Sequence, residues 1–108
     1  MTIGEIAVSE LANFIQQGAR VVDVRETDEY QSGHVPGAIH VALSSVLEQV
    51  SEFQFDVPVY IVCRSGGRSM QACDFLHEAG ITNVVNVAGG TLGWIANGNN
   101  VVMGDQPG

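Results

Sequence analysis

The residue types best suited to chemistry lie together in the segment CRSGGRS, at positions 63–69. Cys63 follows a hydrophobic run, and two glycines come three and four residues after it. Glycine adopts positive φ without a steric penalty, so we expect Gly66 and Gly67 to curl the backbone until successive N–H groups point into one concavity. Such a cradle lowers the pKa of a thiol below its usual value, so that the thiol is ionised and nucleophilic at neutral pH. The segment therefore predicts a reactive thiolate at Cys63.

The charge of the chain makes the same segment unusual. The sequence has twelve acidic residues against four arginines and no lysine, which gives a formal net charge of −8. Two of the four arginines, Arg64 and Arg68, flank the glycines, and we expect both to attract an anionic donor. Arg68 is expected to begin the next helix and Arg64 to lie at the rim; a solvated arginine is the alternative for each. The acidic balance argues against nucleic acid or an anionic membrane as a partner.

Two serines complete the segment. Ser65 is expected in the turn, and Ser69 in the first turn of the following helix, where capping and hydrogen bonding to the site are compatible. A plain turn residue and a plain helix cap are the alternative interpretations. The predicted substrate-binding set is Arg64, Ser65, Gly66, Gly67, Arg68 and Ser69.

The other cysteine and the histidines do not indicate a different chemistry. Cys63 and Cys73 are ten positions apart and form no Cys-x-x-Cys motif, which excludes a zinc ribbon and argues against a disulfide scaffold. Cys73 falls on the apolar stripe of a predicted helix and is expected in the core. His34, His40 and His77 lie elsewhere in the sequence, so we expect no base of the kind that a cysteine hydrolase uses. We expect no metal site and no cofactor.

The elements around this segment predict an α/β domain. Short β-branched runs alternate with amphipathic stretches, which is typical of a mostly parallel sheet. The most hydrophobic run, 57–63, is expected to be the central strand; the other expected strands are 20–25, about 38–41, and 83–90. The expected helices run from Ser9 to about Gln17, over 26–30, from Ser44 to about Phe53, from Arg68 to Ala79, and over 91–98. The tail 99–108 is expected either to add an edge piece or to fray.

This order of elements places Cys63 at the carboxyl end of the central strand, the edge at which parallel α/β sheets bind ligands. The following helix directs its unpaired N–H groups and positive dipole end to the same place. Asp23 and Arg25 end a neighbouring strand beside it. For these two we expect an ion pair, or hydrogen bonds that hold the loop, rather than direct catalysis.

Several other polar or aromatic residues are interpreted as structural. His34, in the turn GHVPGA, is expected to be a hydrogen-bonded turn histidine, and Trp94 to pack near the loop rather than touch substrate. The acidic residues Glu26, Asp28 and Glu29 are expected on a solvated surface.

Length and composition indicate one domain. The 108 residues, 45% of them hydrophobic, fit a single domain over 1–108 that needs neither disulfides nor a metal to fold. No apolar run is long enough to span a bilayer. The N-terminal stretch MTIGEIAVSE has no basic residue and no continuous hydrophobic core, so we expect no secretory signal and a cytoplasmic location.

Three segments, in this order, resemble the single-domain rhodanese family: VVDVRETDEYQSGHVPGA at 21–38, VYIVCRSGGRS at 59–69 and NVAGGTLGW at 86–94. The resemblance implies a five-stranded, mostly parallel sheet with helices on both faces. It also implies a sulfurtransferase in which Cys63 takes a sulfane sulfur from a small anionic donor such as thiosulfate. The resulting persulfide, cradled by the amides of residues 64–68, passes its sulfur to a thiol or cyanide, or to an acceptor protein.

Loop length favours sulfur chemistry over phosphate chemistry. Phosphatases and arsenate reductases on a similar fold use Cys-x5-Arg, whereas Cys63 to Arg68 is Cys-x4-Arg. Tetrahedral phosphate is bulkier than one sulfur atom and needs a wider ring of amides. Two alternatives to the enzyme stay open. The first is a persulfide carrier or redox-sensing module that serves a partner protein and has low turnover on small donors. The second is a catalytically silent interaction domain, and the intact loop argues against it.

Overall fold

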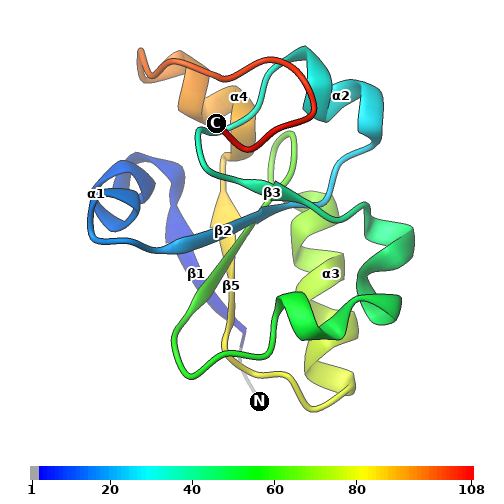
Figure 1. Ribbon diagram of the computed structural model, residues 1–108. Coiled ribbons are helices and arrows are strands. Elements are labelled where there is room, and N and C mark those ends of the chain that lie inside the picture. The colour runs from blue at the N-terminus through cyan, green and yellow to red at the C-terminus, as the bar shows by residue number, and fades with distance from the viewer. Residues whose placement is uncertain (1–2) are drawn as a thin grey trace.

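Five strands form a sheet in which every neighbouring pair is parallel, in the order β1-β5-β4-β2-β3. The computed structural model describes residues 3–108 (Figure 1). The strands are β1 (Gly4–Ala7), β2 (Arg20–Asp23), β3 (Ile39–His40), β4 (Val59–Val62) and β5 (Val84–Ala88). The middle position of β4 confirms the predicted central strand.

Helices cover both faces of the sheet, as predicted (Figure 1). The longest, α3, lies on one face together with two 3-10 helices, η2 and η3, and α1 lies on the other. The helices are η1 (Val8–Glu10), α1 (Leu11–Gln16), α2 (Thr27–Ser32), η2 (Leu43–Glu48), η3 (Val50–Glu52), α3 (Gly67–Glu78) and α4 (Gly90–Ala96). No helix within residues 3–108 is long and apolar enough to cross a membrane.

The alternation of side chains along each strand divides the core into two parts. On β4 and just after it, Val59, Ile61 and Cys63 belong to the cluster that packs beneath α3. Tyr60 and Val62 belong to the cluster on the opposite face, which includes residues of α1 and α4. The alternation of side chains along β4 therefore directs the Cys63 side chain toward the face of the sheet that α3 covers.

Two predicted elements near the N-terminus differ in the structure. Residues Gly4–Ala7 form the fifth strand, at the edge of the sheet, which the sequence analysis did not predict. Three of its four residues are exposed, so it carries no hydrophobic run to signal a strand. The helix expected from Ser9 begins as the 3-10 helix η1 with Ser9 inside it, so Ser9 is not the cap; at this end the Ala7 amide donates to the Glu10 carboxylate over 3.3 Å. Residues 1–2, which belong to the N-terminal stretch 1–10 that was expected to lack a secretory signal, lie outside the described residues.

The helix expected from Ser44 to Phe53 is two 3-10 helices, η2 and η3. Their buried or half-buried apolar residues include Leu43 and Val46, three positions apart. Val50 and Phe53 face the same core, and the spacings of three, four and three along this segment fit an α-helix as well, so the apolar pattern did not distinguish the two helix types.

The C-terminal tail neither joins the sheet nor frays. It crosses from α4 to α2, past the turn that follows α2 (Figure 1). His34 and Val102 form an isolated antiparallel bridge. The buried His34 ring, stacked on Tyr30, lies 2.8 Å from the Tyr30 carbonyl oxygen through Nδ1 and 2.9 Å from that of Gln106 through Nε2. His34 is therefore the hydrogen-bonded turn histidine that was predicted, and it helps to hold the tail.

Candidate active site

Cys63 directly follows β4, and its sulfur lies beneath the loop that leads into α3. The residue is 1% exposed. The Gly66 N–H donates a hydrogen bond to Sγ over 3.1 Å, and the Ser69 hydroxyl oxygen lies 3.3 Å from Sγ. Donors from the loop and from the first turn of α3 therefore converge on one sulfur atom.

These donors act on the ionisation of the thiol. Burial raises the pKa of Cys63, but hydrogen bonds from the Ser69 hydroxyl and from the amides of Ser69, Gly66 and Ser65 outweigh it, so the pKa lies below its usual value. The reason is that a thiolate is a far better hydrogen-bond acceptor than a thiol. The direction agrees with the prediction from the sequence.

Only one of the two loop glycines adopts positive φ. Gly66 has φ +118° and precedes α3 as its N-cap. Gly67 is the first residue of α3, is not among the positive-φ glycines, and a Cβ there would meet nothing within 4 Å. The expectation that both glycines curl the backbone is therefore wrong for Gly67, because Gly66 completes the turn and helical φ is negative from the next residue on.

The side chain of Arg68 points to an acidic partner. Its two terminal nitrogens donate to the Glu29 carboxylate over 2.6 and 2.8 Å, a two-point contact that joins α3 to α2. The hydrogen bond from Arg68 lowers the pKa of Glu29 to about 2. The interpretation of Glu29 as solvated surface is therefore wrong, and the charge of Arg68 is already matched. The partners are 39 residues apart, so no local pattern links them.

Asp23 and Arg25 form an ion pair. This was one of the two structural roles predicted for them, the other being hydrogen bonds that hold the loop. Arg25 donates to the Asp23 carboxylate through Nε over 3.1 Å and through Nη2 over 2.8 Å, and both residues are buried. The same Nη2 donates to the Gly33 carbonyl over 2.8 Å. The pair thus connects the end of β2 to the end of α2. A role of this pair in holding the loop 63–69 stays a prediction.

The start of α4 holds the other side of the loop, which the sequence analysis missed. The Thr91 amide and hydroxyl both donate to the Cys63 carbonyl, over 2.9 and 3.1 Å, and the Leu92 amide donates to the Arg64 carbonyl over 3.0 Å. A Cβ on Gly90 would lie 2.5 Å from each of these carbonyl oxygens, so only glycine permits the approach. The signal was present in the sequence: a Gly-Gly pair follows β5 just as one follows β4.

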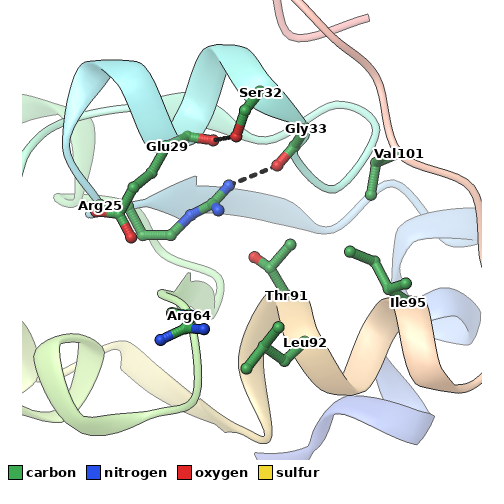
Figure 2. Close-up of a pocket in the computed structure, with 9 residues that line it drawn as sticks. All are labelled: Arg25, Glu29, Ser32, Gly33, Arg64, Thr91, Leu92, Ile95 and Val101. Carbon is green, nitrogen blue, oxygen red and sulfur yellow. Dashed lines mark hydrogen bonds between the residues drawn. The ribbon is translucent and has the colours of Figure 1, made fainter.

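A pocket of about 260 Å³ opens beside the loop. Figure 2 shows Arg64 from the loop, the α4 side chains Leu92 and Ile95, and Val101 from the tail around this space. We call it the loop-side pocket; its lining is Arg25, Glu29, Ser32, Gly33, Arg64, Thr91, Leu92, Ile95 and Val101. Arg64 is exposed, and within residues 3–108 its guanidinium has no acidic partner.

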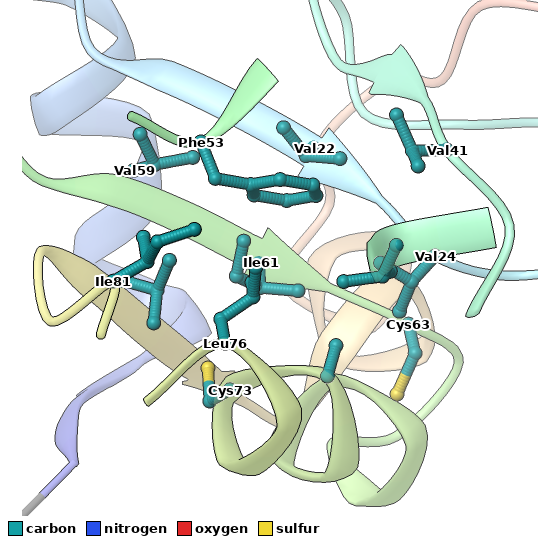
Figure 3. Packing of buried hydrophobic residues seen from close by; sticks show 13 residues of the cluster. Val22, Val24, Val41, Phe53, Val59, Ile61, Cys63, Cys73, Leu76 and Ile81 are labelled. Carbon is teal, nitrogen blue, oxygen red and sulfur yellow. The ribbon is translucent and has the colours of Figure 1, made fainter. Parts of the chain in front are cut away.

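The remaining candidates lie away from the sulfur. Both cysteines are free and belong to the core beneath the sheet (Figure 3). Burial raises the pKa of Cys73 to about 12, which agrees with its prediction as a core residue. His40 lies with its Nε2 2.6 Å from the Arg25 carbonyl oxygen, and Trp94 packs in the opposite core and donates to the Asn100 carbonyl over 2.8 Å. Among the described residues, the hydrogen bonds to the sulfur of Cys63 involve no histidine.

Comparison with known proteins identifies the family. A model described as a rhodanese-like domain matches residues 7–97. The chain belongs to the rhodanese family. The structure of a rhodanese-related protein from Thermoplasma volcanium superposes with a TM-score of 0.83 at 32% identity, covering 93% of this chain and 98% of that one.

Curated relatives connect this rhodanese domain to sulfurtransferases. Thiosulfate sulfurtransferase GlpE of Haemophilus influenzae (strain PittEE) is 34% identical over 94 residues, which cover 87% of this chain and 90% of GlpE. "Putative sulfur carrier protein YrkF" of Bacillus subtilis is 35% identical over 78 residues. That match covers 72% of this chain but only 42% of YrkF, so the domain spans less than half the length of that relative.

Proposed function

We propose that this rhodanese domain is a sulfurtransferase that moves a sulfane sulfur from thiosulfate to a thiol or cyanide through a persulfide on Cys63. The observation that carries the proposal is the buried sulfur of Cys63, which within residues 3–108 has hydrogen bonds to Gly66 and Ser69 and none to a histidine. Such a site stabilises an anion on sulfur and supplies no proton relay to a leaving group. The similarity to GlpE supports thiosulfate as the donor.

The first half-reaction needs no cofactor. The Cys63 thiolate attacks the outer sulfur of thiosulfate, a new S–S bond forms, and the bond to the sulfonate sulfur breaks. Its electron pair leaves with sulfite. In this proposal the amides of residues 64–68 stabilise the charge on the outer sulfur of the persulfide, and the exposed Arg64 attracts the dianionic donor.

The second half-reaction regenerates the thiolate. A nucleophilic acceptor attacks the outer sulfur, and the bond between that sulfur and Sγ breaks. The electron pair of the broken bond stays on Cys63, whose hydrogen bonds from Gly66 and Ser69 stabilise the anion. The same donors that lower the pKa of the thiol therefore make Cys63 a good leaving group.

Mass spectrometry of the intact protein after exposure to thiosulfate tests the proposal. The wild type is expected to gain one sulfur atom on the peptide that contains Cys63 and to release it to cyanide as thiocyanate. Cys63→Ser is expected to gain none and to transfer none. Cys73→Ala is the matched control, and full transfer by Cys63→Ser, or a label on Cys73, would overturn the mechanism.

The carrier function is the second candidate, supported by the similarity to YrkF. Both functions use the Cys63 persulfide, so only turnover separates them. A steady-state assay with thiosulfate and cyanide is expected to show many turnovers per molecule if the domain is an enzyme. A single stoichiometric transfer followed by slow reloading would favour the carrier.

A further inference from the structure

The first turn of α4 is hydrogen-bonded to the backbone of the loop 63–69. The Thr91 and Leu92 amides belong to the donors that a helix leaves without a partner in its first turn. They donate to the carbonyls of Cys63 and Arg64, over 2.9 and 3.0 Å. The Thr91 hydroxyl, on a side chain that is buried, adds a second bond to the Cys63 carbonyl over 3.1 Å. The start of α4 thus fixes two successive carbonyls of the loop (Figure 2).

This first turn lies as close to its neighbours as the backbone permits. On one side, a Cβ on Gly90 would lie 2.5 Å from each of the two loop carbonyl oxygens. On the other side, a Cβ would lie 2.9 Å from Cγ1 of Val8 if placed on Gly89 and 2.6 Å from it if placed on Gly93. Val8, in η1, is itself buried. Because the turn is packed on both sides, its hydrogen bonds act on the loop from a fixed place.

The fixed carbonyls determine where the next two amides point. The peptide bonds of the described residues include no cis bond, and in a planar trans peptide the N–H points opposite to the C=O. The Arg64 amide shares a peptide with the Cys63 carbonyl, and the Ser65 amide shares one with the Arg64 carbonyl. Because both carbonyls face α4, both amides point away from it. The Ser65 amide is one of the donors that lower the pKa of Cys63.

The Thr91 hydroxyl adds to what the backbone of α4 already does. A carbonyl oxygen has two lone pairs, and the Thr91 amide and hydroxyl provide a donor for each at the Cys63 carbonyl. With one donor removed, the peptide 63–64 can rotate more freely about the bonds on either side of it. The amides that follow then lose alignment with the sulfur, and a hydrogen bond weakens steeply as its angle departs from linear.

We propose that Thr91 is a positioning residue for sulfur transfer, which fixes the peptide 63–64 so that the amides of the loop face the sulfur of Cys63. Thr91 acts through the Cys63 carbonyl, the group to which both of its hydrogen bonds go. The alternative is a purely structural role, in which Thr91 stabilises the contact between α4 and the loop and leaves the thiol unaffected. The connection to sulfur transfer rests on the function proposed above, whereas the connection to ionisation of the thiol does not.

Alkylation of Cys63 by iodoacetamide separates the two roles. Thr91→Val removes the hydroxyl at nearly constant shape and is expected to raise the pH midpoint of alkylation by about 0.3–1 unit, the equivalent of about one net hydrogen bond. Thr91→Ser keeps the hydroxyl and is expected to keep the wild-type midpoint. Thr91→Ala removes the hydroxyl without placing a methyl group against the carbonyl, and the same rise is expected. It decides the question if Thr91→Val does not fold.

Two controls account for the substitution itself and for stability. Thr82→Val makes the same change at an exposed threonine. Ile81→Val shortens a buried side chain of the core and lowers stability without contact with α4. Arg68, the cation that interacts with Cys63, stays paired with Glu29 in every variant. An unshifted midpoint in the hydroxyl-free variant that folds, or an equal shift in Thr91→Ser or Ile81→Val, would overturn the proposal.

Steady-state kinetics with thiosulfate and cyanide extend the test to transfer. Thr91→Val is expected to lower kcat/KM for thiosulfate by about two- to tenfold, and Thr91→Ser is expected to restore it. The loss should persist as ionic strength rises toward 1 M, because the substitution removes no charge. Wild-type kcat/KM in Thr91→Val, or a loss that disappears at high salt, would contradict a positioning role in transfer.

The two measurements separate this inference from the proposed function. If thiosulfate leaves no persulfide on Cys63 of the wild type, the sulfurtransferase function fails, while the alkylation midpoint still decides whether Thr91 positions the amides. If the persulfide forms and cyanide accepts it, but the midpoint of Thr91→Val equals that of the wild type, only the role of Thr91 fails.

Discussion

The pKa of the Cys63 thiol depends on a balance between burial and hydrogen bonding at one sulfur atom. Burial opposes the thiolate, and donors from Ser69, Gly66 and Ser65 favour it. Ser69 acts through its hydroxyl as well as its amide, whereas Ser65 acts only through its amide. Substitution of each serine by alanine therefore separates the effect of the side-chain hydroxyl on the pKa of Cys63 from the effect of the backbone amide.

Ser69→Ala is expected to raise the pKa of Cys63, because it removes a donor to the thiolate and leaves the burial unchanged. The pH midpoint of alkylation by iodoacetamide should move upward, and the rate at neutral pH should fall. Ser65→Ala is the control, since the amide remains, and its midpoint should match the wild type. An unshifted midpoint in Ser69→Ala would show that the backbone amides alone set the pKa.

The two loop glycines offer a matched pair of substitutions. Gly66→Ala forces a side chain into φ +118°, which costs about 1–3 kcal/mol of stability and distorts the cradle. Gly67→Ala occupies open space at the first position of α3 and is expected to raise stability by about 0.4–1 kcal/mol. Urea unfolding and sulfur transfer measure both effects. Similar losses in both variants would contradict the assignment of the turn to Gly66.

At the scale of elements, the loop is held from two sides. The Arg68–Glu29 pair ties the start of α3 to α2, and the start of α4 binds the carbonyls of Cys63 and Arg64. These contacts come from parts of the chain that the sequence separates widely. The rigidity of the cradle is therefore a property of three helices together.

Glu29→Gln is expected to lower the free energy of unfolding at neutral pH by about 1 kcal/mol, a modest value because both side chains are about one-third exposed. The pair lowers the pKa of Glu29 from 4.5 to about 2, so its stabilisation is present above pH 4.5 and is lost as the pH falls toward 2. Urea unfolding across this range should show the two proteins converging as the pH falls. A constant difference would mean that ionisation of Glu29 is not the cause.

At the scale of the whole molecule, charge is distributed very unevenly. Three of the four arginines are paired with acids, which leaves Arg64 as the unpaired cation among the described residues of a chain of net charge −8. Under the proposed function, a dianionic donor would meet a repulsive surface with one attractive point beside the loop 63–69.

Arg64→Gln is expected to lower kcat/KM for thiosulfate several-fold at low salt, because it removes this attractive point. The ratio of the two proteins should approach one as ionic strength rises toward 1 M, where the screening length is only about 3 Å. The repulsion from the acidic surface is common to both proteins and largely cancels in the ratio. A ratio that salt does not change would show that Arg64 acts through packing.

The sequence by itself determined the class of fold, the central strand and the lowered pKa of the Cys63 thiol. Its alternation of hydrophobic runs predicts the parallel sheet, and the alternation of side chains along 59–63 places Cys63 on the same face as Val59 and Ile61. These features are local: strand periodicity, a glycine turn and a helix start act over a few residues.

Only the tertiary structure decided which charges are free and what lines the pocket. Arg68 is matched by Glu29, 39 positions away, and the wall at Val101 exists because the tail returns to the turn at His34. The edge strand Gly4–Ala7 likewise depends on its pairing with β5 rather than on its own hydrophobicity. Such contacts join residues that the fold brings together, so their energies have no periodic or local signature in the sequence.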